Sequence, residues 1–89
     1  METVIGLDTP QGVGRQVILK IIGRTPGEAT SNANIVAGSL KEKLTYVLLQ
    51  GPTYEGFDEA ERRHLCSLSV VGATELEVRE ALQLTSITT

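Results

Sequence analysis

The stretch RQVILKII, residues 15–22, carries the clearest strand pattern in the chain. Val17, Leu19 and Ile21 alternate onto one face of an extended backbone, and the other face carries two further isoleucines. Since both faces are largely apolar, this stretch is predicted to be a central strand of a sheet, covered on both sides.

A second β-rich run lies just upstream, at residues 3–7 (TVIGL). Residues 8–12 (DTPQG) separate the two runs and have the Pro and Gly composition of a turn. The two runs are therefore predicted to pair as a β-hairpin.

Residues 24–34 (RTPGEATSNAN) are the polar gap in the chain. Pro26-Gly27 suits a turn that needs a positive φ at its third position, and most of the remaining residues are Ser, Thr, Asn and Ala. This segment is predicted to be a mobile loop.

A helix and a strand are predicted next. Within residues 33–44, apolar residues repeat every fourth position from Val36 to Leu44, as on one face of a helix. Gly38 weakens this pattern, because glycine inside a helix costs about 1 kcal/mol relative to alanine. Residues 45–50 (TYVLLQ) then have strand composition, ended by a Gly-Pro pair.

The charged segment after residue 57 predicts a short helix followed by a strand. Asp58 and Glu61 have the spacing of a capping box. From Cys66 onward the period changes, because Cys66, Leu68 and Val70 alternate with serines. That alternation is typical of a strand with one buried face.

Residues 74–84 (TELEVREALQL) fit a helix capped by Thr74 and Glu77, or alternatively a strand. The helix is favoured because Glu, Ala, Leu and Arg are strong helix formers. Residues 1–89 are therefore expected to form one small α+β domain. We expect a largely antiparallel sheet of about four strands, with two or three helices on one face. If residues 74–84 are a strand, the alternative is a small all-β barrel or sandwich.

Composition limits the functional classes. The chain has 89 residues, 40% of them hydrophobic, and a net charge of −3 from eleven acidic and eight basic side chains. The basic residues are scattered, so nucleic-acid binding is disfavoured. Cys66 is the only cysteine, which excludes an internal disulfide and fits a reducing compartment. With neither a signal peptide nor a membrane-length apolar run, a cytoplasmic location without membrane contact is expected.

Residues 51–63 hold the strongest candidates for binding a partner. Tyr54 and Phe57 are two of the three aromatic residues, and they lie in one segment flanked by Gly and Pro. Aromatic side chains in loops are enriched at protein interfaces. They also commonly fold back over the core, and in a chain with so few rings that is the simpler interpretation. Arg62 and Arg63, in the charged segment that follows, would add an electrostatic contact, although a solvated helix face with internal charge pairing is the simpler interpretation.

Gly12, Gly14 and Arg15 form a candidate anion-binding turn. Backbone N–H groups in a glycine-rich loop can surround a phosphate, and an arginine can neutralise it. A strand is predicted after this segment, whereas phosphate loops normally open a helix. A glycine-permitted hairpin turn is thus the simpler interpretation.

His64 and Cys66 are the one pair with a nucleophile and a base close in sequence. Their i, i+2 spacing brings them to one face only on a strand, and that face is expected to be buried. The simpler interpretation is that Cys66 is a small buried hydrophobe. One Cys and one His do not complete a tetrahedral metal site, so neither a metal nor another cofactor is predicted.

The leading hypothesis is a non-enzymatic interaction or assembly module that binds a protein partner or forms a homo-oligomer. One alternative is a regulatory domain that binds a small molecule or anion at Gly12–Arg15 or within residues 24–34. A second alternative is an enzyme whose site forms between subunits.

Overall fold

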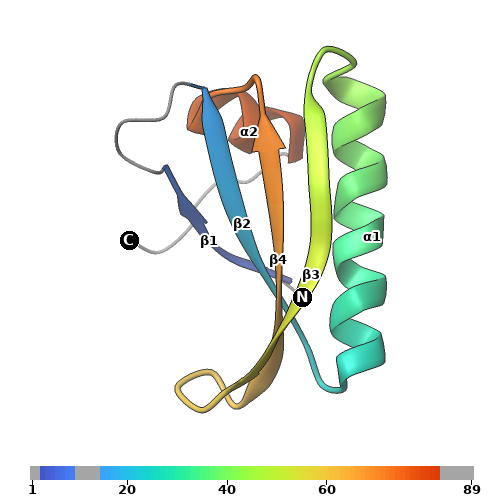
Figure 1. Cartoon of the computed structure of the whole chain (residues 1–89), viewed down its shortest axis with the longest axis vertical. Coiled ribbons are helices and arrows are strands. Elements are labelled where there is room, and N and C mark those ends of the chain that lie inside the picture. The colour runs from blue at the N-terminus through green and yellow to red at the C-terminus, as the bar shows by residue number, and fades with distance from the viewer. Residues whose placement is uncertain (1–2, 10–14, 83–89) are drawn as a thin grey trace.

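The computed structural model describes residues 3–9 and 15–82, which form one four-stranded antiparallel sheet and two helices (Figure 1). The strand order is β1-β2-β4-β3. The elements are β1 (Val4–Asp8), β2 (Gln16–Gly23), α1 (Pro26–Lys43), β3 (Leu48–Asp58), β4 (Arg63–Val71) and α2 (Glu75–Leu82).

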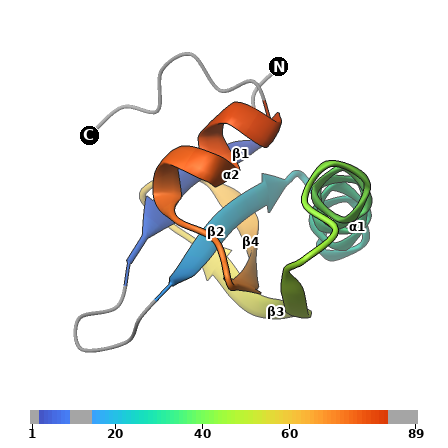
Figure 2. The same cartoon turned by 90° about the horizontal axis from the view of Figure 1, so that it is seen from above.

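Both helices cover the same face of the sheet, as Figure 2 shows from above. This arrangement confirms the expected small α+β domain. Every second residue of β2 and β4 points into the layer between the sheet and the helices, and the core there is aliphatic. The fully buried strand side chains are Val17, Leu19, Ile21, Cys66, Leu68 and Val70. No helix in the described part of the chain is both long and apolar enough to cross a membrane.

The strand β2 is central, as predicted, since it pairs with β1 on one side and β4 on the other. The expectation that both of its faces are covered was wrong. Its second face carries Ile18 and Ile22, which are only partly buried, and both helices of the described ranges lie on the opposite side.

The predicted loop at residues 24–34 was also wrong, because α1 begins at Pro26. Thr25 caps the helix: its Oγ1 accepts a hydrogen bond from the Glu28 N–H at 3.0 Å. Glu28 in turn accepts one from the backbone N–H of Arg24 at 3.0 Å. These bonds satisfy donors that a helix end otherwise leaves free, and proline at the first helical position has no N–H to satisfy.

The apolar face of α1 extends through the segment that had been assigned to a loop. Ala29 and Ala33 are fully buried, in line with Val36 and Leu40 further along the helix. Of the polar residues between Ala29 and Ala33, Thr30 and Ser31 are exposed and Asn32 is half-buried. Polar composition there marks a solvated helix face and not a loop.

The predicted short helix after residue 57 is instead the turn of a long β3–β4 hairpin, and β3 does not end at Gly51. The Asp58 carboxylate caps this turn and not a helix. Its Oδ1 accepts hydrogen bonds from the N–H groups of Ala60 (2.9 Å) and Glu61 (3.3 Å). Arg62 then takes a positive φ of 55°, which reverses the chain into β4.

The helical interpretation of residues 74–84 is confirmed for α2, and the strand alternative is wrong. Thr74 and Glu77 form the expected reciprocal capping box. The Thr74 N–H donates to Glu77 at 3.1 Å, and the Glu77 N–H donates to Thr74 Oγ1 at 3.3 Å. Val78 and Ala81 bury the inner face of this helix.

The Glu77 carboxylate also ties α2 to two other parts of the fold. It accepts hydrogen bonds from the Arg15 guanidinium, just before β2, and from the Tyr46 hydroxyl, just before β3. The Tyr46 hydrogen bond, helped by the Thr74 N–H and by the charge of Arg15, lowers the pKa of Glu77 below its ordinary value of 4.5. The same bond raises the pKa of Tyr46.

These shifts predict a pH dependence of stability. The pKa of Glu77 is lower in the folded state than in the unfolded chain. Its contribution to the free energy of unfolding is therefore complete above the unfolded-state pKa and is lost as pH falls through the folded-state pKa. Because the pKa of Tyr46 is raised by folding, its contribution to the free energy of unfolding is lost as pH rises through that raised pKa. Unfolding by urea from acid to alkaline pH should show both losses, and Glu77→Gln should reduce both. An unchanged pH profile in that variant would contradict the assignment.

Candidate functional site

Three rings meet on the β3–β4 hairpin: Tyr54 and Phe57 from β3 and His64 from β4. We call them the hairpin cluster. The Tyr54 hydroxyl lies 2.7 Å from His64 Nδ1, within hydrogen-bond distance. The Phe57 ring meets the His64 ring edge-on, with ring centroids 5.2 Å apart, and the Tyr54 and His64 centroids are 5.9 Å apart.

A β-bulge is what places both β3 rings on one side of the sheet. In a regular strand, residues three apart such as Tyr54 and Phe57 point to opposite faces. The register shifts between Tyr54 and Gly56, so that β3 contains one extra residue there. Gly56 has a φ of 116°, a conformation that glycine adopts without strain. Tyr54 and Phe57 thus oppose Cys66 and His64, which share a face of β4.

The hairpin cluster lies on the helix side of the sheet but outside the helical layer. The tip of the hairpin curves away from α1 in both views (Figures 1 and 2). Tyr54 is 45% exposed and Phe57 is 54% exposed. These rings therefore do not fold back over the core, which was the simpler alternative for loop aromatics.

The two arginines predicted with these aromatics go to different places. Arg62, in the turn, lines a shallow hollow together with Phe57 and Glu59, so it belongs beside the hairpin cluster. Arg63 lines a different cavity, near Ile22 at the end of β2. Arg63 is separated from the hairpin cluster because Arg63 and His64 are adjacent residues of β4, and adjacent residues of a strand point to opposite faces.

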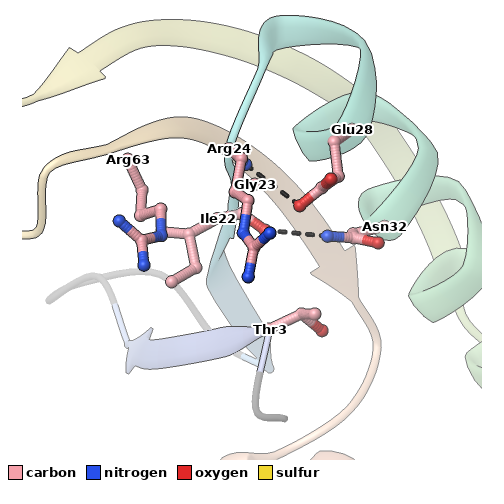
Figure 3. A pocket seen from close by; sticks show the side chains of 7 residues that line it. All are labelled: Thr3, Ile22, Gly23, Arg24, Glu28, Asn32 and Arg63. Atoms are coloured by element: carbon pink, nitrogen blue, oxygen red, sulfur yellow. Dashed lines mark hydrogen bonds between the residues drawn. The ribbon is translucent and has the colours of Figure 1, made fainter.

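That second cavity, of about 20 Å³, lies where β2 meets the start of α1 (Figure 3). Arg24 and Arg63 contribute the positively charged side chains, and Glu28 contributes a carboxylate. The Asn32 side chain donates a hydrogen bond to the Ile22 carbonyl at 3.0 Å, which fixes this side of the helix on the strand. The lining residues are Thr3, Ile22, Gly23, Arg24, Glu28, Asn32 and Arg63.

The candidate anion-binding turn is described only at Arg15, since Gly12 and Gly14 lie outside the described residues. The Arg15 guanidinium forms an ion pair with Glu77 and donates from Nε to the Gly72 carbonyl at 3.3 Å. Arg15 is thus engaged within the fold, by Glu77 and by Gly72.

Cys66 is fully buried beneath α1, with its Sγ 3.7 Å from Thr30 Oγ1. His64 is on the same face but its Nδ1 is engaged with Tyr54. A buried thiol is not accessible to a substrate, so the pair does not form an open nucleophile and base.

Sequence reasoning missed His64 as a member of the hairpin cluster. The signal was present, because the alternation that begins at Cys66 continues backward to His64. Assigning residues 58–63 to a helix concealed it.

A scan against protein-family models found no matching family, and searches of curated proteins and of solved structures found no significant match. No activity or residue role is therefore carried over to this chain from a relative.

Proposed function

We propose that this protein is a non-enzymatic interaction module that binds a protein partner, or a second copy of itself, through the hairpin cluster. The observation that supports the proposal most is that two aromatic side chains, Tyr54 and Phe57, are held about half exposed on a projecting hairpin. Large rings in this position expose apolar area that a partner can bury.

The hairpin cluster suits binding because its rings are already ordered. Each ring contacts His64, so little side-chain freedom remains to be lost when a partner covers them. Arg62 and Glu59 lie beside Phe57 and supply a charged edge. An aromatic centre with a polar rim is the usual composition of a protein–protein contact.

The location that we infer is the cytoplasm. Its support is that the single cysteine is a free, buried thiol, which is compatible with a reducing compartment.

The test places a photo-reactive phenylalanine analogue at position 57 of the full chain, and in a matched variant at Leu76. Leu76 is a suitable control because it is also an exposed apolar residue, 64% exposed, but lies on α2. Light applied in an extract of the protein's own source should link position 57 to one protein, which is identified and purified. That protein is either a different chain or a second copy of this one.

Binding of the purified partner then decides the proposal. Phe57→Ala should weaken binding at least about tenfold, equivalent to about 1.4 kcal/mol, as expected for an interface hot spot. Leu76→Ala should leave the affinity within about twofold, since peripheral contacts contribute little. Equal losses in the two variants, or the same linked products from both positions, would reject the hairpin cluster as the binding surface.

A further inference from the structure

We propose that Arg24 and Arg63 form a site for an oxyanion, a single phosphate or carboxylate group of a ligand. This site is independent of the proposed function. Arg63 points away from the face of β4 that carries His64 and the rest of the hairpin cluster.

Both guanidinium groups line one cavity although they come from distant segments. Arg24 follows β2, and Arg63 begins β4, the neighbouring strand. Figure 3 shows the two guanidinium groups on either side of Ile22, with that of Arg24 on the side nearer Thr3, the residue just before β1. A guanidinium presents several N–H donors in one plane, which match the oxygens of phosphate and carboxylate groups.

Neither guanidinium is neutralised within the described ranges. The ion pairs found in residues 3–9 and 15–82 join Arg15 to Glu77, Lys20 to Asp8 and Arg79 to Glu75. Arg63 donates one hydrogen bond, to the carbonyl of Arg62 at 2.9 Å. That bond leaves further N–H groups of both arginines available to a ligand.

Among residues 3–9 and 15–82, Glu28 is the one carboxylate that lines the cavity, and its Oε1 accepts a hydrogen bond from the backbone N–H of Arg24. Its role is to close the first turn of α1 together with Thr25. Because that turn is already capped, the site depends on the two arginine side chains and not on the helix end.

The size of the cavity limits what enters it. A volume of about 20 Å³ is roughly the space of one water molecule. The cavity therefore admits one oxygen atom of an anionic group, and the remainder of the ligand stays outside. The arginines favour a negatively charged group, and the protein surface around the cavity contacts the remaining atoms of the ligand.

The experiment is an NMR titration of the ¹⁵N-labelled full chain with sodium phosphate, with sodium acetate, and with sodium chloride at matched ionic strength. Phosphate, acetate or both should cause saturable shifts of the Arg24 and Arg63 side-chain N–H signals, with a Kd on the order of 1 mM. Chloride should not. Phosphate binding at least about tenfold tighter indicates a phosphate-bearing ligand, and similar affinities indicate a carboxylate.

Variants separate a specific site from a general charge effect. Arg24→Gln and Arg63→Gln should each weaken binding at least about tenfold. Lys41→Gln removes the same charge from the last turn of α1, at the other end of the helix, and should leave the Kd unchanged. Equal weakening by Lys41→Gln, or identical shifts with all three salts, would overturn the proposal. The spectra of the variants also report directly whether each remains folded.

Discussion

Gly23→Ala is expected to lower the free energy of unfolding by about 3 kcal/mol. Gly23 ends β2 beneath the start of α1, and a Cβ there would lie 2.3 Å from the backbone N of Ala29 and 2.7 Å from the carbonyl carbon of Glu28. Both contacts are with backbone atoms, which cannot rotate away as a side chain can. The first turn of α1 must therefore move off the strand. Urea unfolding followed by circular dichroism measures the loss.

Gly27→Ala is the matched control, because it adds the same methyl group four residues further on. The nearest atom to a Cβ at Gly27 is Thr25 Oγ1, at 3.9 Å, which is an ordinary contact. This variant should be neutral or more stable by up to about 1 kcal/mol, since alanine restricts the unfolded chain. Similar losses for Gly23→Ala and Gly27→Ala would show that β2 and α1 do not approach as closely as described.

Leu68→Ala should cost about 3 kcal/mol, for a different reason. Leu68 is fully buried on β4, opposite Leu19 of β2, where both helices cover the sheet. Its truncation removes apolar contacts and leaves a cavity that surrounding strands close only partly. Leu76→Ala, on the exposed side of α2, should change stability by less than about 0.5 kcal/mol. A small effect at Leu68 would contradict the assignment of the core to this face.

The parts of the fold that the sequence predicted have local signals. The alternation in residues 15–22 is strong enough to identify β2 without any knowledge of its partners. Thr74 and Glu77 identified the start of α2, because both halves of a capping box lie within four residues. Short-range hydrogen bonding and periodicity are properties that one sequence segment carries by itself.

The start of α1 was missed although a local signal existed. Residues 25–28 (TPGE) place a capping threonine, a first-turn proline and an acidic residue in the order of a helix start. Pro26-Gly27 also fits a turn, and the polar residues that follow favoured that interpretation. The buried positions Ala29 and Ala33 are small, so they mark the inner face of the helix only weakly.

The candidate site could be predicted only in part. Tyr54 and Phe57 were selected as exposed loop aromatics, whereas they lie on a strand. The placement of His64 beside these two rings depends on the pairing of β3 with β4 and on the bulge near Gly56. Strand register is set by partners elsewhere in the chain. Asp58 led to the wrong prediction of a helix because an aspartate carboxylate can accept hydrogen bonds from the first N–H groups of either a helix or a turn.

The central functional claim is that the rings of the hairpin cluster are available for binding because folding does not require them. The most direct test is the urea unfolding free energy of the double variant Tyr54→Ala/Phe57→Ala, compared with Leu68→Ala. The rings lose mainly their contacts with His64, each at the lower end of about 0.5–1.5 kcal/mol because the rings are half exposed, so we predict a decrease of about 1 kcal/mol. A decrease as large as that of Leu68→Ala, about 3 kcal/mol, would assign the two rings to the core and contradict the proposal.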